Sequence, residues 1–192
     1  MSFIGVVLAG GQSKRMGSDK ALLTLNGENM LARTFHCLQQ AHAKDVIISR
    51  NLPSEQSLQD IYANKGPLSG IHTAAVNRPN LDLLLVPVDL PYLHHRTLQQ
   101  LSHYSQKHHC SSYFAKHNLP LYLLNNHNTV TILEHILLRT DDYSVASFIR
   151  QIGAQAIQPA DNQHLVNTNY PDQWQQAQQA LTADKHSAYK ET

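Results

Sequence analysis

Continuous apolar runs alternate along this chain with stretches in which apolar residues recur at helical spacing. The clearest apolar runs are Ile4–Ala9, Asp45–Ser49 and Leu81–Asp89. Their composition is typical of strands that are buried on both faces, as in parallel sheets. A shorter strand is expected at Leu22–Leu25, closed by the turn dipeptide Asn26-Gly27.

Helical periodicity fills the intervals between these runs. Met30–Gln40 has an apolar side, with Thr34 and Gln39 on the other side. The turn Gly66–Gly70 opens a second helix that continues through Val76. Four more helices are predicted, and the last of them should turn Trp174 and Leu181 inward: Leu98–Ser105, Thr131–Arg139, Val145–Ile152 and Pro171–Leu181.

The second half of the chain adds shorter strands at Ser112–Ala115 and Leu121–Leu124, and an edge strand at Ala154–Gln158. The alternation of strands and helices predicts an α/β protein with three layers, α/β/α, around a mostly parallel, Rossmann-like sheet. We expect one domain over residues 1–183 and a polar, disordered tail over residues 184–192. In such sheets ligands bind beyond the carboxyl ends of the strands.

The composition narrows the class of partner. The net charge of +1 provides no general attraction to nucleic acid or to membranes. Two cysteines without C-x-x-C spacing argue against a disulfide framework and a zinc site, and the 13 histidines are scattered. The chain enters a strand directly after Met1 and has no apolar run of the roughly 18 residues that span a membrane, so we expect a cytoplasmic protein.

Residues 8–20 carry the strongest chemical signal, because a glycine-rich turn with three cations follows a buried strand. Gly10 and Gly11 let a ligand approach the backbone closely. Exposed N–H groups of such a turn bind anions, and the added Lys14, Arg15 and Lys20 point to a polyphosphate. The glycine spacing matches neither a P-loop nor the dinucleotide fingerprint G-x-G-x-x-G.

Two further polar segments stand at positions where such a sheet binds ligands. Asp89 ends the most apolar strand. A carboxylate at such a position needs a partner or a metal ion such as Mg²⁺. The alternative is that Asp89 caps a helix or forms a turn. The segment Asn167-Thr168-Asn169 precedes the last helix. Residue types alone leave capping and ligation equally open there.

The loop L-A-G-G-x-S-x-R-M-G-x-D-K and the strand ending in Val86-Pro87-Val88-Asp89-Leu90-Pro91 resemble those of the molybdenum cofactor guanylyltransferases. The resemblance runs from about Ile4 to Trp174 and includes Gly66–Gly70, which matches the family's G-P-L-x-G segment. It implies the nucleotide-diphospho-sugar-transferase type of fold and the transfer of GMP from GTP to Mo-molybdopterin. Mg²⁺ is the implied cofactor, and molybdoenzymes or their chaperones are the implied recipients.

The resemblance also implies the site residues. Lys20, Arg15 and Asp89 would be catalytic, with Lys20 beside the α-phosphate and Arg15 on the β- and γ-phosphates. Asp89 and Asn169 would hold the metal. The nucleotide would be bound by Leu8, Ala9, Gly10, Gly11, Lys20, Ser49, Asp60 and Asp89, with Asn51 as the alternative to Ser49 near the base.

The chain departs from the family at Asn118-Leu119-Pro120-Leu121, where the family has a polar residue before proline and where the pterin should bind. Two alternatives therefore stay open. One is a nucleotidyltransferase that uses CTP or UTP on a pterin, sugar phosphate or polyol phosphate. The other is a nucleotide- or cofactor-binding protein without turnover.

Overall fold

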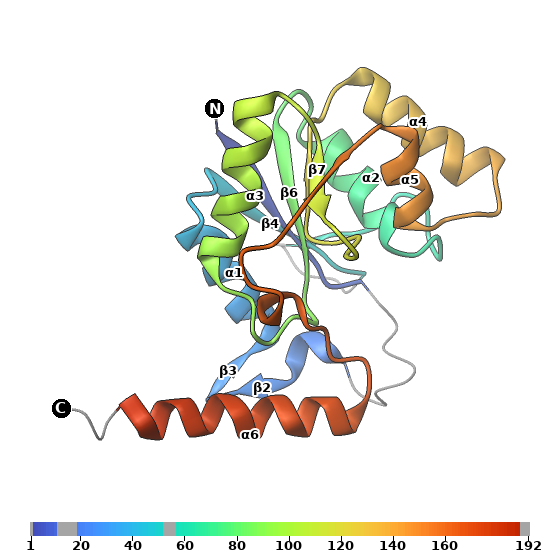
Figure 1. Cartoon of the computed structure of the whole chain (residues 1–192). Helices are drawn as coiled ribbons and strands as arrows, with labels where there is room; N and C mark the ends of the chain where they lie inside the picture. The colour runs from blue at the N-terminus through green and yellow to red at the C-terminus, as the bar shows by residue number, and fades with distance from the viewer. Residues whose placement is uncertain (1, 11–18, 52–56, 189–192) are drawn as a thin grey trace.

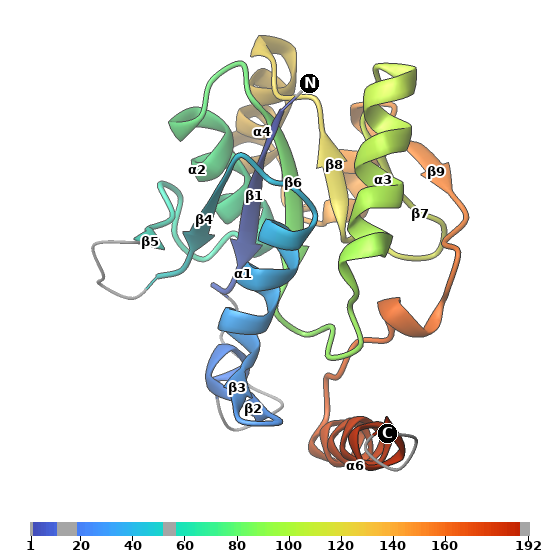
Figure 2. The same ribbon diagram turned by 90° about the vertical axis from the view of Figure 1, so that its left-hand side faces the viewer.

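A seven-stranded sheet forms the centre of the computed structural model, which describes residues 2–10, 19–51 and 57–188, with side chains up to Leu181. The strand order is β5-β4-β1-β6-β8-β7-β9 (Figure 2). The strands are β1 (Phe3–Leu8), β4 (Asp45–Ser49), β5 (Ser57–Leu58), β6 (Asp82–Pro87), β7 (Ser112–Phe114), β8 (Leu121–Leu123) and β9 (Gln155–Ile157). Only β8 runs against the others in the described sheet, so the predicted mostly parallel sheet is confirmed.

Helices cover both faces of this sheet, which confirms the three-layer prediction (Figure 2). They are α1 (Met30–Gln40), α2 (Pro67–Asn77), α3 (His95–His108), α4 (His127–Arg139) and α5 (Val145–Gln151). Alternate residues of β1 point to opposite cores, so that Val6 packs with α2, α4 and α5, and Val7 packs with α1 and α3. Both side chains are fully buried.

A hairpin and the last helix lie outside the three layers (Figure 1). The hairpin pairs β2 (Thr24–Leu25) with β3 (Glu28–Asn29), and Asn26 and Gly27 both have the positive φ that a tight hairpin turn requires. α6 (Pro171–Ala188) packs against it through Trp174, which contacts the cluster of Leu25 and Met30.

Most predicted elements are present with small shifts of their ends. α1 and β4 have the predicted bounds, whereas the strand expected at Leu22–Leu25 is divided between a 3₁₀ turn, η1 (Lys20–Leu22), and β2. The prediction that Thr34 lies on the polar side of α1 is wrong, since Thr34 is buried; its hydroxyl remains satisfied there because it donates to the Met30 carbonyl at 2.8 Å. α6 continues through residues 184–188, which were expected in the tail.

The register of the central strands places three chain segments at one edge of the sheet. Leu8 at the end of β1 lies opposite Ser49 of β4 and Pro87 of β6. The segments that follow these strands therefore begin side by side.

Candidate active site

The carboxyl ends of β1, β4 and β6 border a cavity of about 950 Å³. Its wall also includes the start of α2 and the residues around η1. The lining residues are Leu8, Ala9, Gly10, Asp19, Lys20, Ser49, Asn51, Gln59, Asp60, Ala63, Asn64, Gly66, Pro67, Gly70, Pro87, Val88, Asp89 and Leu119. The cavity thus lies where ligands bind in open α/β sheets.

The cavity brings most of the predicted site residues together. The predicted nucleotide-binding residues that line it are Leu8, Ala9, Gly10, Lys20, Ser49, Asp60 and Asp89. Gly11 and Arg15, as well as Lys14, lie outside the described residues. Leu119, from the segment expected to face the pterin, also lines the cavity.

Lys20 joins two segments that are far from it in the sequence. Its Nζ donates to Asn169 Oδ1 at 2.7 Å and to Asp89 Oδ2 at 3.3 Å. The Lys20 and Asp89 side chains are only 15% and 22% exposed, so their attraction is screened less than on an open surface. Asp89 lies two residues beyond β6, and its carbonyl accepts from the Thr168 N–H at 2.9 Å. This backbone bond holds the segment of Asn169 against that of Asp89.

Asn167 holds the Asn169 side chain, and Gln173 holds its backbone. Asn169 Nδ2 donates to Asn167 Oδ1 at 3.0 Å, which leaves Oδ1 of Asn169 for Lys20. Gln173 in the first turn of α6 accepts from the Asn169 backbone N–H at 2.8 Å and from the Tyr170 N–H at 3.2 Å. Gln173, a residue of α6 itself, makes these hydrogen bonds at the start of the helix, and the amide oxygen of Asn169 points at Lys20.

Asp60 and Asn51 form a second polar pair in the cavity wall. Asn51 Nδ2 donates to Asp60 Oδ2 at 2.8 Å, and the Asp60 N–H donates to Asn51 Oδ1 at 2.9 Å. The other carboxylate oxygen, Oδ1, is buried and has no hydrogen-bond partner among the described residues. Burial raises the pKa of the Asp60 carboxyl, and the Asn51 hydrogen bond partly offsets this effect. A buried acceptor of this kind is ready for an N–H donor from a ligand.

Gly70 explains why a small residue ends the G-P-L-x-G segment. A Cβ on Gly70 would lie 2.3 Å from Ser49 Oγ and 3.4 Å from Leu8 Cδ2. The absent side chain therefore lets α2 approach β4 closely at the cavity floor. Ser49 is buried at this contact.

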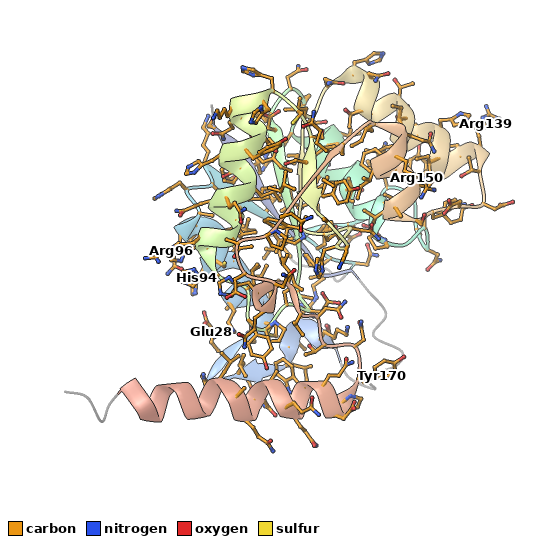
Figure 3. The ribbon with its side chains drawn as sticks, viewed as in Figure 1. Glu28, His94, Arg96, Arg139, Arg150 and Tyr170 are labelled. Carbon is orange, nitrogen blue, oxygen red and sulfur yellow. The ribbon has the colours of Figure 1, made fainter. Side chains whose placement is uncertain are left out.

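A second cavity of about 450 Å³ lies between α1 and the segment leading to α3. Three of its charged or titratable side chains contact one another, because Glu28 lies 2.6 Å from His36 Nδ1 and 3.9 Å from Arg33 Nη1. Figure 3 shows Glu28 and His94 on this side of the molecule. None of the predicted site residues that the structure describes lines this cavity, and we place the candidate site in the larger one.

Oxygen ligands, rather than a cluster of histidines, are available for a metal ion in the larger cavity. No group of three or more His, Cys, Asp or Glu side chains within residues 2–10, 19–51 and 57–181 is arranged to hold a metal. Asp89 and Asn169 point two oxygen atoms at the same cationic group, the Lys20 ammonium. A hard divalent cation takes such ligands, together with substrate phosphates and water.

Comparison with known proteins decides the family. Residues 5–185 match the MobA-like NTP transferase domain. The chain belongs to this family. The resemblance found in the loop after β1 and at Asp89 is therefore confirmed at the level of the family.

Curated relatives and solved structures agree with this assignment. A molybdenum cofactor guanylyltransferase of Xanthomonas euvesicatoria is 33% identical over 88% of this MobA-like chain and 91% of its own length. One of Photobacterium profundum is 28% identical over 92% and 95%. The structure of molybdopterin-guanine dinucleotide biosynthesis protein A from Archaeoglobus fulgidus superposes with a TM-score of 0.76 at 16% identity, covering 94% and 100% of the two chains.

The fold extends to nucleotidyltransferases with other substrates. The 2-C-methyl-D-erythritol 4-phosphate cytidylyltransferase of Thermus thermophilus superposes with a TM-score of 0.69 at 11% identity, covering 95% of this MobA-like chain and all of that one. The expected nucleotide-diphospho-sugar-transferase type of fold is thereby confirmed. Over the described residues, no helix is long and apolar enough to span a membrane.

Three features of the site escape the sequence analysis. The coupling of Asn51 to Asp60 depends on the two-residue strand β5, which has no recognisable pattern. Gln59 and Asn64 line the cavity on the segment after that strand. Asp19 could have been noticed, because it stands directly before Lys20 in the loop motif.

Proposed function

We propose that this chain transfers GMP from GTP to Mo-molybdopterin, yielding the guanine dinucleotide form of the cofactor and pyrophosphate. The observation that carries the proposal is that Lys20 and Asp89 line the cavity of a MobA-like NTP transferase, and that Lys20 contacts both Asp89 and Asn169. The relatives named molybdenum cofactor guanylyltransferase supply the substrates.

The nucleotide lies along the carboxyl ends of β1 and β4 in this proposal. Gly10 lets the phosphates approach the backbone where β1 ends. Asp60 reads the base, because its buried Oδ1 accepts hydrogen bonds and guanine presents N–H groups on its pairing edge. Uracil and cytosine cannot present the same pair of donors, so a site that depends on this acceptor discriminates against them.

Asp89 and Asn169 would hold Mg²⁺ through their oxygen atoms. When bound, the ion would neutralise negative charge on the triphosphate. A lower net charge makes the α-phosphorus accessible to an anionic attacking group.

The reaction needs positioning and charge stabilisation rather than a base. A terminal phosphate oxygen of the acceptor forms a bond to the α-phosphorus of GTP, and the bond from that phosphorus to pyrophosphate breaks in line. Pyrophosphate leaves with the bonding electron pair, and no proton has to be removed because the attacking oxygen is already anionic. Lys20 stabilises the charge that develops on the α-phosphate.

Release of pyrophosphate from each of GTP, CTP, UTP and ATP, with Mg²⁺ and Mo-molybdopterin, tests the proposal. We expect turnover with GTP alone. Turnover with CTP or UTP would instead support the alternative of a nucleotidyltransferase that uses one of these nucleotides. GTP at about 100 times its Kd should stabilise the protein by about 2.7 kcal/mol. Such stabilisation without pyrophosphate release would favour the binding protein without turnover.

Asp89→Ala tests the metal assignment. We expect the loss of turnover and of the Mg²⁺ dependence of GTP binding, because one of the two oxygen ligands disappears. GTP titration by calorimetry with and without Mg²⁺ provides the measurement, and Asp141→Ala at an exposed position is the matched control. Unchanged turnover in the Asp89 variant would contradict the assignment. The molybdoenzyme recipients and the cytoplasmic location stay predictions.

A further inference from the structure

An ion pair between Asp19 and Arg50 lies directly beside Lys20. Arg50 Nη2 donates to Asp19 Oδ2 at 2.5 Å. The Arg50 side chain is only 13% exposed and that of Asp19 34%, so solvent screens this pair less than an open surface pair. Arg50 follows the last residue of β4, and its backbone N–H donates to the Leu58 carbonyl at 3.0 Å. The pair thus connects the sheet to the residue that precedes Lys20.

Both carboxylate oxygens of Asp19 are in use. Oδ1 accepts from the Ala21 N–H at 3.0 Å and caps the 3₁₀ turn η1, while Oδ2 accepts from Arg50. Lys20 is the first residue of that turn. The backbone of Lys20 is therefore held by a cap on one side and, through Asp19, by the sheet on the other.

We infer that the Asp19–Arg50 ion pair positions Lys20 so that its ammonium can contact the α-phosphate. The inference rests on the proposed function and deepens it. The long Lys20 side chain can adopt many rotamers, and it reaches Asn169 and Asp89 only when η1 starts at the correct place. Asp19 and Arg50 act through Lys20, and a shift of about 1 Å in a group of this kind can cost about 10² in turnover.

Arg50→Gln and Asp19→Asn test the inference. Asn caps a turn about as well as Asp, so Asp19→Asn removes the charge toward Arg50 and keeps the cap on Ala21. We expect each variant to lower kcat by about 10-fold to 10²-fold with little change in KM for GTP. The double variant should fall no further than the single ones, because both remove the same interaction.

The deciding comparison is the effect of Arg50→Gln on kcat in the wild type and in the Lys20→Ala variant. If Arg50 acts through Lys20, Arg50→Gln changes kcat there by less than about twofold. An equal loss of kcat in both backgrounds, or a rise in KM alone, would overturn the inference, because Arg50 would then act on the substrate directly. Arg78→Gln is the matched control, since Arg78 pairs with Asp45 at 3.6 Å at the opposite end of β4 and should retain wild-type kcat.

A crystal structure of Arg50→Gln gives a readout that needs no turnover. We expect Lys20 Nζ to lie clearly farther from Asn169 Oδ1 than the 2.7 Å of the wild type. An unchanged Lys20 would overturn the inference. If the wild type releases no pyrophosphate from any nucleotide, the proposed function fails, and this structure still decides whether Arg50 positions Lys20.

Discussion

In the candidate site, the Lys20 side chain contacts residues from two distant parts of the sequence. Its ammonium contacts Asp89 and Asn169, which follow β6 and precede α6. An amino group held by two oxygen atoms is oriented before any substrate arrives. In electrostatic catalysis this pre-orientation avoids reorganisation during the reaction.

Replacement of Lys20 by Ala should therefore lower kcat by roughly 10²–10³-fold, as for the loss of one transition-state donor. KM for GTP should change much less, because the main contribution is made in the transition state. Steady-state pyrophosphate release measures both constants, and Lys44→Ala at an exposed position serves as control. An effect confined to KM would mean that Lys20 only binds the nucleotide.

Asp60→Asn should reduce the preference for GTP. Asn51 Nδ2 donates to Oδ2 and needs an acceptor there, so the amide nitrogen of the variant takes the place of Oδ1. In the proposed complex the guanine N–H groups would then lose their acceptor at a buried position. We expect KM for GTP to rise by about 10-fold or more and kcat to change less. The ratio of kcat/KM for GTP to that for ATP is the measurement, and an unchanged ratio would remove Asp60 from base recognition.

Single residues could be predicted from the sequence where a motif or the end of a strand marks them. Lys20 stands in the loop motif, and Asp89 follows a strand too apolar to face water, so the sequence predicts both at one edge of the sheet, where the cavity lies. The pairing of Asn51 with Asp60 could not be predicted. It depends on how the chain returns after β4, which no local pattern records.

At the scale of elements, long periodic segments were predicted well and short ones poorly. α1 and β4 have the expected bounds because their apolar patterns are complete. β5 contains only two residues and β3 only two, too few for a period to appear. The reversed direction of β8 could have been inferred from the short connection after β7, since a parallel neighbour requires a much longer crossover.

The packing of α2 on α4 buries a histidine that should make stability depend on pH. His72 on α2 is 2% exposed, lies 3.6 Å from Glu134 Oε1, and packs against the Tyr62 ring. Burial lowers the pKa of His72 from its ordinary value of 6.5, and Glu134 partly offsets this effect. The unfolded chain therefore binds the proton more readily than the folded one.

Stability from His72 is accordingly present above about pH 6.5 and is lost as the pH falls through the lowered pKa of the folded state. His72→Gln should flatten the fall in unfolding free energy between about pH 7 and pH 5. Denaturant unfolding at several pH values gives this slope. His103→Gln, at an exposed position, should leave the slope as in the wild type. Equal slopes for His72→Gln and the wild type would contradict the prediction.

At the scale of the whole molecule, α6 connects the end of the chain to its beginning. It lies across the β2–β3 hairpin, and Trp174 packs with Leu25 and Met30. Asn26 Nδ2 also donates to the Leu181 carbonyl at 3.3 Å. The hairpin begins shortly after Lys20, beyond η1, and α6 begins shortly after Asn169, so this cluster joins the two segments that carry these residues.

Trp174→Ala should destabilise the protein by about 3–5 kcal/mol, the usual cost of removing a large buried aromatic side chain. It should also lower kcat, since the segment of Asn169 loses its support.

The chain has a single tryptophan, so its fluorescence reports this contact in the wild type. If residues 1–183 form one domain, fluorescence and circular dichroism will give the same midpoint, and two midpoints would contradict that prediction.

Asp89 and Asn169, which contact the Lys20 ammonium, are added to the chain at very different times during translation. Asn169 is added to the growing chain 149 residues after Lys20. When the segments of β1, β4 and β6 have been synthesised, the chain still lacks the oxygen atom that Lys20 contacts at 2.7 Å. A chain released before residue 169 would therefore contain Lys20 and Asp89 without the Asn169 amide oxygen that also contacts the Lys20 ammonium.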